Sequence, residues 1–387
     1  MKIAHVITRL IIGGAQENTV LTCAGLRDGG HDVTLIAGPE TGPEGSLWPQ
    51  ADASCTHTIK LDSMRRSVKP LLDYKCAGEL AAIFRREKFD IIHTHSSKAG
   101  IVARYAAHKA GGAKVVHTIH GMSFNRTQSK LTQRVFAYLE RRAARWTDAI
   151  ISVADAMTEQ SVNANIAPRE RFTTIRSGIE TTLFEPNAQT RAEVRKRWGM
   201  ANEAVVVGTV ARLFENKGYE HILKAMPAIV RMCPHVRFVW IGDGAHRGQY
   251  EAELARLGLS DRVVFTGLVS PDEVARLMNG MDILVHASMW EGLPRVLVQA
   301  SLMKVPCVSF DNDGAPEAID NGVSGWLVPL GDCTKLGERV AHLCNDAELR
   351  ASMGEGARAH CVERFDVQKM VDDIANLYEK LVASPAR

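Results

Sequence analysis

Short β-branched runs alternate with helical patterns from one end of this chain to the other. Between the runs, segments such as 69–88 and 217–232 carry apolar residues at spacings of three and four. Strands that alternate with helices predict parallel sheets covered by helices on both faces, with right-handed crossovers. The strand candidates are residues 2–8, 32–38, 89–95, 113–120, 148–154, 204–213, 236–244, 262–268, 282–288, 305–310 and 325–329.

Strand character is lost near residues 180–203, which also contain Pro186. We therefore expect an α/β protein of two Rossmann-like doubly wound domains, 1–182 and 183–365, that face a cleft. Residues 366–387 are expected to form a C-terminal helix that crosses back to the first domain. Its apolar side comprises Val367, Met370, Val371, Ile374, Leu377, Tyr378 and Leu381. In such sheets ligands bind beyond the carboxyl ends of the strands, so motifs that follow strands are the functional candidates.

The first residues favour a β-strand over a signal peptide, and no apolar run approaches the roughly 20 residues that cross a bilayer. The eight cysteines are scattered without a CxxC pair. This pattern favours buried thiols over a disulfide framework or a zinc site. We expect a cytoplasmic enzyme or binding protein.

The net charge of +3 conceals an asymmetry between the two halves. Residues 1–180 carry 24 Lys and Arg against 17 Asp and Glu, whereas the remainder carries 23 against 27. Such a split favours an anionic partner for the first half, although ordinary solvated surface charge produces it too. Nucleic acid is disfavoured, because no stacking aromatics stand among the cations.

Gly13 and Gly14 follow the first predicted strand and open a helix. Glycines allow close backbone approach to a ligand, and a helix N-terminus favours anions. The alternative is a tight turn without a ligand. Because the segment lacks the GxGxxG pattern, a dehydrogenase is disfavoured.

Four histidines lie near strand ends, at His93, His95, His117 and His120. No Asp or Glu stands beside them at ligand spacing, so we predict no metal site. His120 ends a strand and is followed by Gly121, which makes it the candidate for hydrogen bonding to a substrate.

Two cations follow the first strand of the second half. Arg212 stands at the end of that strand, and Lys217 precedes the next helix together with Gly218. Two cations and a helix N-terminus suit a pyrophosphate, with plain surface charge as the alternative.

Glu291 follows another strand, and Gly292, Leu293, Pro294 and Arg295 then open a helix. A carboxylate there can hold hydroxyl groups, while free backbone N–H groups can face phosphate oxygens. Gln299 lies eight residues after Glu291, about two helical turns, so the two would line one side of a ligand. The nearby segment 311–313, Asp-Asn-Asp, favours a turn over a metal-binding DxD motif.

Taken together, these motifs resemble those of the retaining glycosyltransferases of family 4, which have the GT-B architecture. The resemblance covers nearly all of the chain and rests on motifs in order. They are GGAQ at 13–16, HTIHG at 117–121, IRSGIE at 175–180, VARLFENKG at 210–218, IGDG at 241–244, VFTGLVSPDEV at 264–274, EGLPRVLVQA at 291–300 and GAPEAI at 314–319.

The resemblance implies a nucleotide-sugar donor held by the second domain and an acceptor held by the first. Arg212 and Lys217 would then hold the diphosphate, Glu291 the sugar hydroxyls, and Val269 the base through its backbone. The backbone of 292–295 would lie beside sugar and phosphate, with Gly14 against the diphosphate and His120 beside the transferred sugar. No metal or other cofactor is implied, and UDP is the nucleotide expected.

Three positions depart from the family pattern. Gln299 stands where a second Glu is usual and would hold ribose hydroxyls without charge. Pro294 removes a backbone donor, and Ser177 replaces an Asn of the linker motif. These departures are typical of a subfamily.

The implied reaction is a retaining sugar transfer, and no second carboxylate is identifiable as a nucleophile. Alternatives that remain open are a nucleotide-sugar epimerase, a phosphorylase and a degenerate non-catalytic binding protein of the same fold.

A basic amphipathic helix is predicted within 124–146, where Glu140 is the one acid. We place Lys130, Arg134, Arg141 and Arg145 near one face and Val135, Phe136 and Leu139 on another. Such a helix can rest on anionic lipid, which favours a lipid-linked acceptor in cell-envelope polysaccharide synthesis and peripheral attachment to the inner face of the membrane. The alternative is a solvated helix. The cations of this patch are Lys130, Arg134, Arg141, Arg142 and Arg145.

Overall fold

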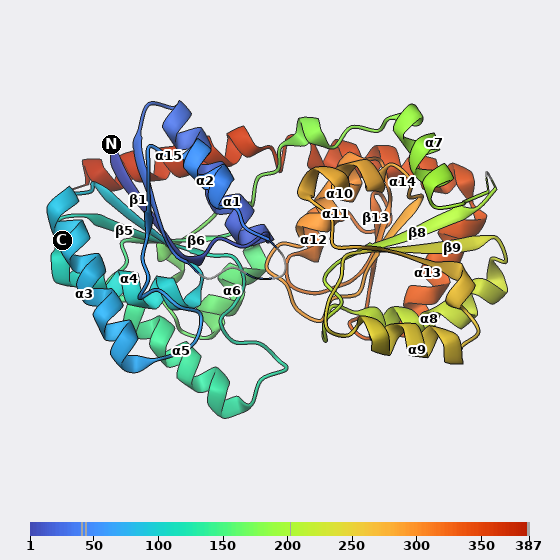
Figure 1. The fold of residues 1–387 in the computed structure, drawn as a ribbon, viewed down its shortest axis with the longest axis horizontal. Coiled ribbons are helices and arrows are strands. Elements are labelled where there is room, and N and C mark those ends of the chain that lie inside the picture. Colours follow the sequence, from blue (N-terminus) through green and yellow to red (C-terminus); the bar gives the residue numbers. More distant parts are fainter. Residues whose placement is uncertain (40–41, 43–44, 202, 385–387) are drawn as a thin grey trace. The chain divides into compact units, whose positions relative to one another are not determined.

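The computed structural model describes residues 1–39, 42, 45–201 and 203–384. The chain divides into two compact units. The first unit comprises Met1–Gly178 together with the chain from Val367 onward, and the second comprises Ile179–Asp366. Figure 1 shows each unit as a sheet covered by helices.

The first unit contains a seven-stranded sheet of order β3-β2-β1-β4-β5-β6-β7, in which the paired strands are parallel. Its strands are β1 (Lys2–Arg9), β2 (Asp32–Gly38), β3 (His57–Lys60), β4 (Ile91–His95), β5 (Lys114–Ile119), β6 (Ala149–Ser152) and β7 (Phe172–Thr174). Its helices are α1 (Gly14–Asp28), α2 (Trp48–Ser54), α3 (Pro70–Glu87), α4 (Ser97–Ala110), α5 (Lys130–Ala144), α6 (Asp155–Asn163), the 3₁₀ turn η1 (Arg169–Arg171) and α15 (Val367–Ala383).

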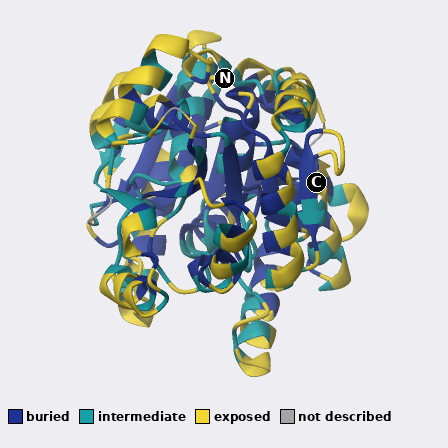
Figure 2. Cartoon of the chain, turned by 90° about the vertical axis from the view of Figure 1, so that its right-hand side faces the viewer, coloured by how far each residue is buried: buried dark blue, intermediate teal, exposed yellow. Residues whose placement is uncertain are grey.

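Alternate residues of the central strand β1 enter two separate cores. Ile3 and Ile7 pack with α1 and α15 on one face of the sheet, whereas Ala4 and Val6 pack with α3 and α4 on the other. Side chains of a strand point alternately to opposite faces, so a strand covered on both faces is apolar throughout. Figure 2 shows buried strands beneath helices whose outer faces are exposed.

The second unit repeats this plan with a parallel six-stranded sheet of order β10-β9-β8-β11-β12-β13. Its strands are β8 (Val205–Val210), β9 (Val236–Ile241), β10 (Val263–Gly267), β11 (Ile283–His286), β12 (Cys307–Phe310) and β13 (Gly325–Val328). Its helices are η2 (Thr181–Leu183), α7 (Ala188–Arg197), α8 (Tyr219–Met232), α9 (Arg247–Arg256), η3 (Ser260–Arg262), α10 (Pro271–Met278), α11 (Arg295–Leu302), α12 (Ala315–Ala318), α13 (Cys333–Asn345) and α14 (Ala347–Cys361).

The division differs by a few residues from the boundaries expected from sequence. The second unit starts at Ile179 rather than 183, and the chain returns to the first unit at Val367. Helix α15 packs Met370, Val371, Ile374 and Tyr378 into the core that contains β1. The strands β3 and β7, at the two edges of the first sheet, were not among the predicted strands.

Within the described residues, no helix is both long enough and apolar enough to span a bilayer. The eight cysteines carry free thiols, and each of them except the half-buried Cys333 is buried. In each sheet the order reverses between two central strands, β1 and β4 in one unit and β8 and β11 in the other. The carboxyl ends of these strand pairs are where doubly wound sheets bind ligands.

Candidate active site

An ion pair marks the reversal point of the second sheet. The loop after β8 carries Lys217, and the loop after β11 carries Glu291. Lys217 Nζ lies 2.7 Å from Glu291 Oε1, and the two side chains are 27% and 23% exposed. The structure thus joins two residues that the sequence places 74 positions apart.

Backbone contacts hold these two loops together. Gly218 has φ +90°, and a Cβ there would lie 2.2 Å from the carbonyl carbon and oxygen of Ala287, so only glycine fits. The N–H of Met289 donates to the carbonyl of Asn216 at 3.0 Å. The Glu291 N–H donates to Asp313 Oδ2 at 2.8 Å. These backbone contacts fix the two loops relative to each other and thereby position Lys217 and Glu291.

The Glu291 carboxyl is ionised at neutral pH. Burial acts to raise its pKa, but the nearby Lys217 ammonium and further hydrogen bonds leave the pKa below its ordinary value. His286 Nε2 lies 3.7 Å from Glu291 Oε1, and burial lowers the pKa of this imidazole to about 4. The charged members of this cluster at neutral pH are thus one ammonium and one carboxylate.

Arg212 lies in the same loop as Lys217, but on the exposed side. Its guanidinium lies over the ring of Phe214, 5.1 Å from the ring centroid. Val269 is half-buried between β10 and α10. Both residues follow strands of the same sheet, as the motif positions predicted.

One geometric expectation was wrong. Helix α11 begins at Arg295, and Pro294 is its N-cap, so Glu291 lies in the preceding loop. The two-turn helical spacing between Glu291 and Gln299 therefore does not apply, because proline at 294 takes an extended conformation before the helix. Gln299 is half-buried within α11, and Gly292, Leu293 and Pro294 are buried.

The segment Asp311–Asp313 forms a turn, as expected. Asp313 has φ +49° and accepts the Glu291 N–H, while the Asn312 amide donates to the Ser288 carbonyl at 3.2 Å. These contacts give the segment a structural role in holding Glu291.

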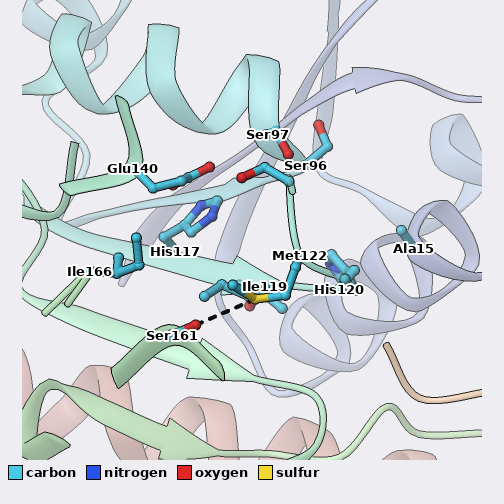
Figure 3. Close-up of a pocket in the computed structure, with 13 residues that line it drawn as sticks. Ala15, Ser96, Ser97, His117, Ile119, His120, Met122, Glu140, Ser161 and Ile166 are labelled. Carbon is cyan, nitrogen blue, oxygen red and sulfur yellow. Dashed lines mark hydrogen bonds between the residues drawn. The ribbon is translucent and has the colours of Figure 1, made fainter. Parts of the chain in front are cut away.

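In the first unit, a pocket of about 260 Å³ lies beyond the ends of β4 and β5. Figure 3 shows His120 beside Ala15 on one side of it, with His117 and Glu140 on the other. Gly13 is the N-cap of α1, and Gly14 is the first residue of that helix, directly before Ala15. The predicted residues Gly13, Gly14 and His120 thus gather at one edge of the first sheet.

Behind His120, histidines form a hydrogen-bonded chain. His120 Nε2 lies 3.0 Å from His95 Nδ1, and His95 Nε2 lies 2.9 Å from His5 Nδ1. His93 packs against both His5 and His95, with ring centroids 4.9 and 4.2 Å away. Burial lowers the pKa of His5 to about 3 and also lowers the pKa of His93 and His95. The buried rings are neutral at pH 7.

Sequence reasoning missed His5. The available signal was a polar residue inside an otherwise apolar strand, in KIAHVITR. Its partners come from β4, which pairs with β1 and places His93 directly beside His5.

Within the described part of the chain, His5, His93 and His95 come close enough to share a metal ion, with candidate ligand atoms within 4.8 Å of one another. However, His93 already contacts Tyr378 Oη at 2.5 Å and Thr118 Oγ1 at 2.6 Å, and His5 and His95 bond to each other. A metal would have to break these bonds, so the donor set fits a hydrogen-bonded cluster better.

Helix α5 carries the predicted basic patch, but its apolar residues are arranged differently from the prediction. Val135 was expected to face away from the cations, yet it is 49% exposed, beside Leu131 at 72% and Tyr138 at 57%. The packed side consists instead of Ala137, Glu140, Ala143 and Ala144, because Glu140 pairs with the buried Arg104 at 2.6 Å. The exposed side therefore mixes large apolar side chains with Lys130, Arg134, Arg141, Arg142 and Arg145.

Arg141 differs from the other cations of the patch, because its guanidinium donates twice to the Ala164 carbonyl, at 3.0 and 2.8 Å. Beside α5, a groove of about 510 Å³ runs between α3, α4 and α5. It combines apolar walls with charged side chains, and Lys98 is paired there with Asp73 at 2.6 Å. Other lining residues are Arg9, Arg66, Val68, Ile101, Phe136 and Leu139.

Comparison with known families covers almost the whole chain. Residues 12–183 match the model of Glycosyltransferase Family 4, and residues 190–360 match the model of Glycosyl transferases group 1.

Among curated proteins, the chain is similar to the Escherichia coli UDP-Gal:alpha-D-GlcNAc-diphosphoundecaprenol alpha-1,3-galactosyltransferase. The identity is 27% over 387 residues, covering 99% of this chain and 98% of that protein. It is also similar to the capsular polysaccharide biosynthesis glycosyltransferase CapM of Staphylococcus aureus, with 24% identity over 91% of each chain.

Among solved structures, Anabaena HepE in complex with UDP and glucose superposes with a TM-score of 0.84 at 23% identity, covering 98% of this chain and all of that one. The sucrose-phosphate synthase of Thermosynechococcus elongatus superposes with a TM-score of 0.83 at 19% identity, covering both chains fully. The expected GT-B fold is thereby confirmed.

Proposed function

This chain belongs to glycosyltransferase family 4, and we propose that it transfers a hexose from a UDP-linked donor to a lipid-linked acceptor with retention of configuration. The observation that carries the proposal is the Lys217–Glu291 pair at the reversal point of the second sheet. A cation and a carboxylate side by side match two adjoining parts of a nucleotide sugar, its diphosphate and the hydroxyl groups of its sugar.

In this proposal the second unit binds the donor. Lys217 has three N–H donors, and its bond to Glu291 leaves others for diphosphate oxygens. Arg212, in the same loop, adds a second cation. Glu291 accepts hydrogen bonds from sugar hydroxyls, beside the backbone of 292–295. Val269 contacts the base through its backbone, and Gln299 bonds ribose hydroxyls.

The acceptor hydroxyl attacks the anomeric carbon from the face that the phosphate leaves. The C–O bond to the phosphate breaks, the new glycosidic bond forms, and the departing phosphate takes the hydroxyl proton. Lys217 and Arg212 stabilise the charge that develops on the phosphate, which is commonly the largest catalytic contribution. These cations take the place of a catalytic metal, so activity is expected to persist in EDTA.

The choice of UDP is supported by relatives. The Escherichia coli protein is named for UDP-Gal, and HepE structures contain UDP or UDP-glucose. The choice of acceptor is supported by the diphosphoundecaprenol in the same relative's name and by the amphiphilic groove of the first unit. A diphosphate suits Arg9 and Arg66 there, and an isoprenoid suits Val68, Ile101 and Phe136.

The exposed mixture of cations and large apolar side chains on α5 supports peripheral attachment to an anionic membrane. An enzyme that acts on a polyprenyl diphosphate has to reach its acceptor at the lipid surface. We therefore place the protein in the cytoplasm with access to the inner face of the membrane.

Isothermal titration with UDP, GDP and ADP, each with and without its common sugars, tests the donor. We expect micromolar binding of UDP and UDP-hexoses, weakened by Lys217→Ala, and loss of the preference for the sugar form in Glu291→Ala. The exposed Lys224 of α8 provides a control, because Lys224→Ala removes a cation of the same unit outside the ion pair.

Folded protein that binds none of these ligands would overturn the proposal in favour of a non-catalytic binding protein. Conversion of a nucleotide sugar without any acceptor would instead indicate an epimerase.

A further inference from the structure

The histidine chain of the first unit has a direction, because each neutral imidazole carries one proton. A neutral ring donates from one nitrogen and accepts at the other. The two bonds, His5 Nδ1 to His95 Nε2 and His95 Nδ1 to His120 Nε2, must therefore point the same way. Either His5 donates to His95 and His95 to His120, or both bonds are reversed.

The far end of the chain distinguishes the two directions. His5 Nε2 is buried and has no hydrogen-bond partner among residues 1–39, 42, 45–201 and 203–384. In the reversed chain this nitrogen would carry a proton and be a buried donor without an acceptor. In the forward direction, in which His5 donates to His95 and His95 donates to His120, this nitrogen carries an unshared lone pair and no proton. Buried N–H groups without partners are the rarer defect in folded proteins, so the forward direction is favoured.

We infer that His5 and His95 are positioning residues that hold His120 as the Nδ1-protonated, neutral tautomer. His120 lines the pocket of the first unit, and in this form its proton is on Nδ1, while its Nε2 accepts from His95 and cannot act as a base. This inference rests on the proposed function, in that a sugar hydroxyl or ring oxygen bound in the pocket is what the Nδ1–H group would meet.

The surroundings of the chain keep its buried members neutral and fixed. His93 packs against His5 and His95 and is itself held between Tyr378 of α15 and Thr118 of β5. Arg104, a buried cation of the same unit, is paired with Glu140 at 2.6 Å. No carboxylate of the described residues bonds to His5, His95 or His93, so nothing on the described elements stabilises an imidazolium there.

The test is ¹⁵N NMR of the full chain labelled at histidine, because protonated and bare nitrogens of a neutral imidazole resonate far apart. In the wild-type protein we expect Nδ1 of His5, His95 and His120 to be protonated and their Nε2 atoms to be bare. This measurement needs no variant and no substrate. A protonated Nε2 on His120 would overturn the inference.

Two substitutions at His5 sharpen the test. His5→Asn keeps a donor where Nδ1 stood, so the tautomer of His120 should be retained. His5→Leu removes the donor, so His95 and His120 should change tautomer or become mixtures. The neighbouring Val6→Ala perturbs the same buried strand without touching a hydrogen bond and should leave the tautomers unchanged. An unchanged His120 in His5→Leu would also refute the inference.

Addition of Zn²⁺ provides a further check. Shifts of the ring signals of His5, His93 and His95 at stoichiometric Zn²⁺ would identify these residues as metal ligands and overturn the hydrogen-bonded chain. Unchanged spectra support it.

A kinetic measurement separates this inference from the proposed function. With a UDP-hexose that binds, His5→Leu should lower kcat/KM about tenfold, the value of one hydrogen bond, and His5→Asn should restore it. If no UDP-sugar binds, the proposed function fails while the tautomers remain measurable. If donors bind but His120 carries its proton on Nε2, only the present inference fails.

Discussion

The two sheets share one strand order, but the chemistry at their reversal points is opposite. In the second unit a half-exposed ammonium and carboxylate face each other at 2.7 Å. In the first unit, fully buried neutral histidines occupy the equivalent place between β1 and β4. A group stays charged where water and an ionic partner compensate the charge, whereas full burial without an ionic partner favours the neutral form. The same scaffold can therefore present either ionic or neutral hydrogen bonding at this edge.

The means of positioning differ as well. Lys217 and Glu291 are placed by main-chain contacts, with Gly218 pressed against the Ala287 carbonyl. His120 is placed through side chains, by way of His95 and His5. The first arrangement should be sensitive to backbone substitutions and the second to pH and to side-chain isosteres.

Acidification should produce the largest effect and should open the first unit before the second. The pKa of His5 is about 3 in the folded protein, whereas an ordinary histidine has a pKa of 6.5. Between these two pH values the unfolded chain binds a proton at His5 and the folded chain does not. This contribution to stability is complete above pH 6.5 and falls by about 1.4 kcal/mol for each pH unit below that value. The total loss is about 5 kcal/mol at pH 3. His93, His95 and His117 act in the same sense.

In the second unit, His286 has a pKa of about 4, and the corresponding loss reaches about 3 kcal/mol at pH 4. Down to that pH the first unit loses more because several buried histidines contribute together. Hydrogen exchange at pH 7, 5.5 and 4.5, read by mass spectrometry, should show β1, β4 and β5 opening before β8 and β11. His5→Asn should make the acid response of the first unit shallower. Earlier opening of β8 and β11 would contradict the comparison.

The substitution Gly218→Ala should destabilise the second unit by about 3 kcal/mol and abolish tight UDP binding. It combines a left-handed φ with a Cβ placed against the Ala287 backbone. Gly258→Ala is the matched control, since Gly258 has φ +69° but a Cβ there would meet nothing within 4 Å, and it should cost about 1 kcal/mol. Chemical denaturation and titration with UDP measure both effects. Equal losses in the two variants would show that the backbone contact does not position Lys217.

Neutralising Lys130 and Arg134 together should weaken binding to anionic vesicles about thirtyfold, since each cation near the surface contributes about 1 kcal/mol. These two are better choices than Arg141, whose guanidinium holds the Ala164 carbonyl. The control is Lys196→Gln with Lys335→Gln, which removes two exposed cations of the second unit.

Sedimentation with phosphatidylglycerol and phosphatidylcholine vesicles at low and high salt measures the difference. Equal weakening by both pairs of substitutions would mean that attachment follows total charge rather than α5. Absence of binding by the unaltered protein would remove the membrane proposal.

Gln299→Glu should have the smallest effect, a roughly fivefold gain in UDP affinity, since hydrogen bonds to a charged acceptor are stronger by about 1 kcal/mol. Gln299→Leu should weaken binding by a similar factor. Calorimetry of the three proteins shows whether charge matters in the second unit beyond Lys217 and Glu291. No change in either variant would remove Gln299 from the donor site.

The repeating pattern of strands and helices was enough to predict two doubly wound sheets, because strands covered on both faces are apolar throughout. It did not predict β3 or β7. The side chains of β3, HTIK, are exposed or half-buried, so the strand carries no apolar run, and β7 is only three residues long. Edge strands of this kind are defined by pairing with a neighbour rather than by their own composition.

The site was predictable in part for a related reason. The rule that ligands bind at strand ends made Lys217, Glu291 and His120 candidates individually. The contact between Lys217 and Glu291, and the role of His5, depend on which strands become neighbours, and that follows from the order of the sheet. The spacing argument for Gln299 failed because it assumed a helix already at Glu291.

Helix α15 has a consequence for how the protein is made. The first unit receives Met370, Ile374 and Tyr378 from a segment that is synthesised after the whole second unit. The second unit can therefore complete its core before α15 is synthesised, whereas the first unit has to wait for that helix. A nascent chain stalled before residue 367 would expose the apolar surface of α1, and chaperones would be expected to bind it there.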